Sequence, residues 1–145
     1  NCVVAEDDGR VVGKLHTYGC DDVASVIPDD PFMPGRRLAI LNSCFPPTPV
    51  SWHIEAMAVL PEYQGRGLGH EFLEIAEGQC RRNGFGALSL HVFEANEGAR
   101  RLYERCGFGA VDRVPIPDEV GLPHLGGSIL MIRDLRLGDA PADHR

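Results

Sequence analysis

The chain has 145 residues, of which 43% are hydrophobic and 24% charged, and its formal net charge is -7. This length and composition fit one globular domain that buries roughly two-thirds of its unfolded surface. No apolar run approaches the roughly 20 residues that span a bilayer, and no signal-peptide pattern opens the chain, so no membrane partner is expected. The acidic balance argues against nucleic acid as a partner, because phosphate-backbone binding requires a basic face.

The cysteines and histidines indicate neither a disulfide framework nor a metal site. Five cysteines are scattered without a Cys-x-x-Cys pair, which is typical of reduced thiols in a cytoplasmic protein. His16, His70 and His124 show no clustering, so no metal is expected. The cysteines are Cys2, Cys20, Cys44, Cys80 and Cys106.

The first third of the chain predicts a hairpin followed by an irregular segment. Two short strands, 3–5 and 10–17, flank a turn whose Gly9 can take positive φ. Six prolines then interrupt residues 19–49, where 36–43 could make a short helix. We expect this segment to be a surface excursion.

The rest of the chain alternates strand and helix patterns and ends in a polar tail. Apolar residues recur at helical spacing over two segments, the first closed by Gly84 and the second capped by Asn96 and stopped by Gly107. We expect strands at 52–59, 87–93, 108–114 and 128–135, and helices at 68–83 and 96–106. The inward stripe expected on the first helix is Leu68, Phe72, Ile75, Ala76 and Gln79 or Cys80.

The stretch from Val59 to His70 predicts a pyrophosphate-binding turn. An apolar strand ends there, glycines follow, and an amphipathic helix begins. Backbone N–H groups at a helix N-terminus, with the positive end of the helix dipole behind them, attract phosphate, and glycines let it approach closely. A Rossmann turn is disfavoured because the third glycine of its pattern is replaced by His70, and a Walker loop because no Lys-Ser or Lys-Thr follows.

Two motifs together resemble the acetyl-CoA signature of the GNAT N-acetyltransferases. They are Gln64-x-x-Gly67-x-Gly69 and Asn96-x-x-Ala99-x-x-Leu102-Tyr103-Glu104-x-x-Gly107-Phe108. The resemblance covers most of the chain and implies an α/β GNAT-type fold with a mixed central sheet and helices on both faces. Family members normally begin with a strand and one or two helices that cover the acceptor site, and we expect these elements to be absent here. The expected domain is 1–137, with a flexible tail at 138–145.

The resemblance also implies how acetyl-CoA is held. Two parallel strands, ending near Val59 and Phe93, splay apart, and the pantetheine arm lies between them, paired with strand backbone. A strand amide, that of Met57, polarises the thioester carbonyl. The implied cofactor-binding residues are Met57, Ala58, Val59, Gln64, Gly65, Arg66, Gly67, Leu68, Gly69, His70, Asn96, Ala99 and Tyr103.

The implied catalytic residues are one acid and three alternative bases. In the family, a tyrosine at the position of Tyr103 protonates the leaving thiolate. Bases occur on the strand that holds His53 and Glu55, and His91 matches the position of a glutamate base in the ribosomal-protein acetylating type. Side chains alternate along a strand, so His53, Glu55 and Met57 are expected on one face. Histidine titrates near neutrality, which favours a base with an apparent pKa between about 6 and 8.

The expected function is acetyl transfer from acetyl-CoA to a primary amine by direct attack in a ternary complex. Two alternatives stay open: a CoA-binding or regulatory module without turnover, and an acidic interaction protein that binds no CoA. The expected partners are acetyl-CoA and an amine acceptor, with a homodimer left open. Acceptor specificity is expected from the variable segments 19–49 and 115–127.

Overall fold

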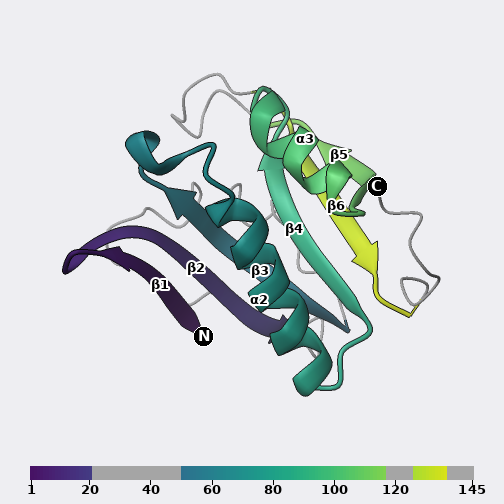
Figure 1. Ribbon diagram of the computed structural model, residues 1–145. Helices are drawn as coiled ribbons and strands as arrows, with labels where there is room; N and C mark the ends of the chain where they lie inside the picture. Colours follow the sequence, from purple (N-terminus) through teal and green to yellow (C-terminus); the bar gives the residue numbers. More distant parts are fainter. Residues whose placement is uncertain (21–49, 117–125, 137–145) are drawn as a thin grey trace, which may run out of the picture.

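The computed structural model describes residues 1–20, 50–116 and 126–136. In these residues a six-stranded sheet has the order β1-β2-β3-β4-β6-β5 (Figure 1). β3 and β4 run parallel and every other neighbouring pair is antiparallel, which confirms the mixed sheet expected from the sequence. The strands are β1 (Cys2–Asp7), β2 (Arg10–Cys20), β3 (Ser51–Val59), β4 (Ala87–Phe93), β5 (Gly109–Val114) and β6 (Ser128–Asp134).

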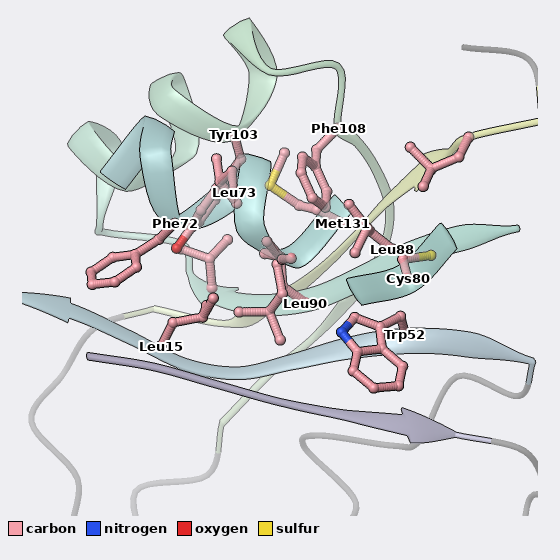
Figure 2. Packing of buried hydrophobic residues seen from close by; sticks show 14 of the residues in the cluster. Leu15, Trp52, Phe72, Leu73, Cys80, Leu88, Leu90, Tyr103, Phe108 and Met131 are labelled. Atoms are coloured by element: carbon pink, nitrogen blue, oxygen red, sulfur yellow. The ribbon is translucent and has the colours of Figure 1, made fainter. Parts of the chain in front are cut away.

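Two α-helices, α2 (Leu68–Arg82) and α3 (Glu97–Arg105), cover one face of this sheet. Figure 2 shows Phe72 and Leu73 of α2 on the same side of the strands as Tyr103 of α3. All three belong to one cluster with Leu90 and Met131 of the sheet. The described residues thus support helices on one face, and the second face carries no helix in the ranges that the structure describes.

Every expected element that falls within the described residues is present, with bounds within three residues of the expected ones. One detail of the helix stripe was wrong. Leu73 is 2% exposed and lies in the core, whereas Ile75 is 37% exposed. The buried stripe of α2 is therefore shifted around the helix, away from Ile75 and toward Leu73.

A β-bulge changes the side-chain directions along β3. His16 of β2 pairs with Ala56 and Thr17 pairs with Ile54, so Glu55 has no partner on β2. Met57, opposite Leu15, therefore packs toward the helices and joins the core cluster. The expectation that Met57 shares a face with His53 and Glu55 was wrong, because the extra residue reverses the alternation.

Some expectations concern residues outside the described ranges. These are most of the 19–49 excursion with its helix at 36–43, part of the 115–127 segment, and the tail at 138–145. Among the described helices, none combines the length and the apolar character needed to cross a membrane.

Candidate active site

The site begins where the parallel strands β3 and β4 separate. Their pairing ends at Ile54 and Leu90, so beyond Ile54 the edge of β3 that faces β4 has no ladder partner. A cavity of about 210 Å³ lies in this gap. Glu55 and His91 line it, as do Asn96 and Tyr103. The gap thus joins the side chains of the strands to the base of α3.

A larger cleft of about 890 Å³ continues from the gap toward the start of α2. Tyr103 and Asn96 line both spaces, so the two are adjacent. Twelve of the thirteen residues expected to bind the cofactor line this cleft, and Arg66 does not. The complete lining of the cleft comprises Met57, Ala58, Val59, Tyr63, Gln64, Gly65, Gly67, Leu68, Gly69, His70, Asn96, Gly98, Ala99, Leu102, Tyr103, Arg105 and Cys106.

Gly65 and Gly67 form the turn that leads into α2. Their φ angles are +75° and +86°, a conformation that favours glycine, and a Cβ on either residue would meet nothing within 4 Å. Gly67 is the N-cap of α2, and no side chain caps this helix end. The first backbone N–H groups of a helix have no partners within it and carry the positive end of its dipole. The turn therefore offers an open, electropositive site for an anion.

Gly69 has a different role from the two turn glycines. A Cβ at this position would lie 2.8 Å from the Cδ2 atom of Leu102. The missing side chain lets the first turn of α2 approach α3. Gly69 thus brings together the two helices that form the walls of the cleft.

Two side chains beside the turn contact protein rather than open space. The Gln64 amide donates a hydrogen bond of 3.0 Å to the Val59 carbonyl. The Arg66 guanidinium lies 4.8 Å from the centroid of the Tyr63 ring, and the Tyr63 hydroxyl donates to Asp7. Tyr63 lies in the short helix η1 (Pro61–Tyr63). The Gln64 amide thus uses one of its two N–H donors within the protein, although Gln64 also lines the cleft.

Tyr103 lies where the gap and the cleft meet. It is 8% exposed, and Figure 2 shows its hydroxyl directed from α3 toward the strands. Burial raises the pKa of Tyr103, so the hydroxyl keeps its proton at neutral pH. Among the described residues this hydroxyl has no hydrogen-bond partner. A buried hydroxyl without a partner calls for an explanation, and a bound ligand supplies one.

Asn96 stands beside Tyr103 at the start of α3. Its side-chain oxygen accepts a hydrogen bond of 3.3 Å from the Ala99 N–H and so caps the helix. The same residue lines both the gap and the cleft, which leaves its amide nitrogen available to a ligand.

His53 and His91 lie on the face away from the helices. His53 is 5% exposed, and its Nδ1 lies 2.8 Å from the Ser89 hydroxyl. Burial, and next the neighbouring His91, lowers the pKa of His53 to about 4. His53 is therefore neutral at pH 7 and does not match the expected base with a pKa of 6 to 8. His91 is half-buried and lines the gap.

Glu55 is the most accessible of the three expected bases. Its side chain is 51% exposed, and one carboxylate oxygen lies 3.8 Å from the Nε2 atom of His53. The Tyr18 hydroxyl on β2 is hydrogen-bonded to this carboxylate. Burial, and next the Glu55 charge, raises the pKa of Tyr18 to about 12, so Tyr18 remains a donor. The site thus holds a carboxylate at the bulge, beside the strand gap.

Several lining residues were not expected from the sequence. Gly98, Leu102 and Arg105 recur at helical spacing and line the cleft from α3. That spacing was visible in the sequence, but Leu102 was noted only as part of the family motif, and Gly98 and Arg105 were not singled out. Tyr63 could not be assigned from the sequence, since its position depends on the path of the turn.

The chain matches the model of the acetyltransferase (GNAT) family over residues 1–108. It is 42% identical over 52 residues to the uncharacterized N-acetyltransferase YycN of Bacillus subtilis, a match covering 36% of this chain and 33% of the relative. It is 45% identical over 56 residues to the [ribosomal protein bS18]-alanine N-acetyltransferase of Haemophilus influenzae, covering 39% and 38%. The matches thus span less than two fifths of these relatives' lengths.

Solved structures show the same fold. Naa20 of Chaetomium thermophilum, in complex with a bisubstrate analogue, matches with a TM-score of 0.66 at 21% identity, over 97% of this chain and 68% of that one. A GNAT family acetyltransferase from Elizabethkingia anophelis, with acetyl-CoA bound, matches with a TM-score of 0.64 at 16% identity, over 92% and 75%.

Proposed function

Because this chain belongs to the acetyltransferase (GNAT) family, we propose that it transfers an acetyl group from acetyl-CoA to a primary amine by direct attack in a ternary complex. The observation that carries this proposal is the Tyr103 hydroxyl, which is buried and without a partner among the described residues. It lies where a long cleft meets the gap between two parallel strands. At this point an amine that enters from the face of the sheet away from the helices can reach a thioester held in the cleft, with the leaving sulfur beside Tyr103.

The residues of the cleft fit acetyl-CoA. The ligand supplies an acetyl group activated as a thioester. The turn at Gly65 and Gly67 offers backbone N–H groups to its pyrophosphate, and the free edge of β3 at Met57 offers backbone groups to its amides. None of the residues that line the cleft is acidic, although the chain carries a net charge of -7. The absence of acidic residues there suits an anionic ligand.

Tyr103 serves as the general acid. Its raised pKa keeps the proton on the hydroxyl until a thiolate leaves beside it. The Met57 amide stabilises the negative charge that develops on the carbonyl oxygen. A preorganised donor of this kind lowers the reaction barrier by roughly 3 kcal/mol.

Glu55 and His91 act on the acceptor amine. The exposed Glu55 carboxylate binds the ammonium form, which carries the opposite charge. His91, which lines the same gap from the other strand, takes the proton. Burial and the neighbouring His91 lower the pKa of His53 and keep it neutral, so His53 does not accept the proton from the amine.

The experiment is an assay of CoA release with a panel of amines: polyamines, amino acids, aminoglycosides and peptides with a free N-terminus. The peptides are included because one similar protein acetylates a ribosomal-protein alanine. Amine-dependent release supports the proposal. Acetyl-CoA binding without release by any amine favours the alternative, a CoA-binding module without turnover.

A further inference from the structure

Arg105 is an arginine whose charge is not engaged by other described residues. Most described arginines form an ion pair, a hydrogen bond or a ring contact; Arg101, for example, pairs with Glu97, and Arg66 lies on Tyr63. Within the described ranges only Arg82 and Arg105 have no such contact. Of these two, Arg105 alone lines the cleft.

Arg105 lines the same cleft as the anion-binding turn, from the opposite helix. Leu102 of α3 packs against Gly69 in the first turn of α2. Arg105 follows Leu102 on the same face of α3, about one helical turn later. The other basic side chain on the cleft is His70, which lies in the first turn of α2, with its Nδ1 atom 3.5 Å from a Glu74 carboxylate oxygen. Arg105 is therefore a separate cationic point on the opposite wall.

CoA carries two kinds of phosphate. The pyrophosphate can be held by backbone N–H groups and the helix dipole at the turn. The phosphomonoester on the adenosine ribose carries close to two negative charges at neutral pH, and an arginine matches such a group with two parallel hydrogen bonds. On the described cleft wall, Arg105 is the arginine without another partner.

We propose that Arg105 binds the phosphomonoester at the adenosine end of CoA, so that this protein distinguishes CoA from dephospho-CoA. The inference rests on the proposed use of acetyl-CoA. Arg105 is exposed, on the last turn of α3, and its replacement leaves the hydrophobic core intact.

The test is calorimetric titration of the full chain with CoA and with dephospho-CoA. The wild type should bind CoA at least about tenfold more tightly, the usual scale of a charge-assisted contact. Arg105→Gln should weaken CoA binding to the level of dephospho-CoA and leave dephospho-CoA binding unchanged. Arg101→Gln is the matched control on the same helix, and it should keep the wild-type ratio.

Three results would overturn the inference. Equal wild-type affinity for the two ligands removes the discrimination. Equal weakening of both ligands by Arg105→Gln places the arginine at the pyrophosphate instead. If the folded wild type binds neither ligand, the proposed function fails, and the inference fails with it. Circular dichroism of both variants establishes that they are folded.

Discussion

Acid should destabilise this protein through His53, a buried histidine that stays neutral in the folded state. Burial, and next His91, lowers its pKa from 6.5 to about 4. Unfolding exposes the ring and restores the ordinary value. Between these two pKa values the unfolded state binds a proton that the folded state excludes, so the free energy of unfolding falls as the pH falls.

The magnitude follows from the two pKa values. A shift from 6.5 to about 4 corresponds to about 3 kcal/mol, at about 1.36 kcal/mol per pH unit. This contribution is present above pH 6.5. Linkage gives a loss of about 2 kcal/mol by pH 5 and of about 3 kcal/mol by pH 4. A domain is stabilised by only about 5–15 kcal/mol, so the loss is measurable.

Urea denaturation at pH 7 and pH 5 measures the effect. His53→Asn is the informative variant, because the asparagine amide can replace Nδ1 in the bond to Ser89 without titrating. The wild type should lose about 2 kcal/mol more than this variant between the two pH values. His16→Asn, at an exposed histidine on β2, should behave like the wild type. An identical pH dependence of wild type and His53→Asn would refute the reasoning and restore His53 as a candidate base.

Four further outcomes are expected. Tyr103→Phe should lower turnover by about 100-fold or more while the acetyl-CoA Kd changes little, and equal turnover would make Tyr103 a structural residue. Gly67→Val should weaken acetyl-CoA binding by more than about tenfold in calorimetry of the folded variant, because its Cβ enters the open space of the anion site. With an active amine, Glu55→Gln should mainly raise the acceptor KM and His91→Gln should mainly lower kcat, and the reverse pattern would exchange their roles. Leu90→Ala should reduce the free energy of unfolding by about 2–5 kcal/mol in urea, since Leu90 is 1% exposed, and a smaller loss would mean that the core closes over the cavity.

The element order could be predicted because local signals agree with the tertiary structure. Gly67 and Gly107 adopt positive φ at the helix boundaries where glycines were expected to act, and Asn96 caps α3 through its own side chain. The strand expected at 87–93 matches β4 at both ends. These features depend on neighbouring residues alone.

The remaining features depend on long-range packing. The sequence pattern of β3 does not reveal the bulge that leaves Glu55 without a partner on β2. This bulge nevertheless directs Met57 toward the helices. From the sequence, the Arg66 side chain could reach either a phosphate or a ring; it lies on Tyr63, whose hydroxyl is held by the distant Asp7 of β1. The low pKa of His53 likewise arises from burial and from a residue on another strand.

Calorimetric titration of the wild-type chain with acetyl-CoA tests the central claim most directly, because it needs no knowledge of the acceptor. The cleft, with its electropositive turn and its lining free of acidic residues, predicts saturable binding of one acetyl-CoA per chain. A folded protein that shows no binding of acetyl-CoA would contradict the assignment of this cleft and the function built on it.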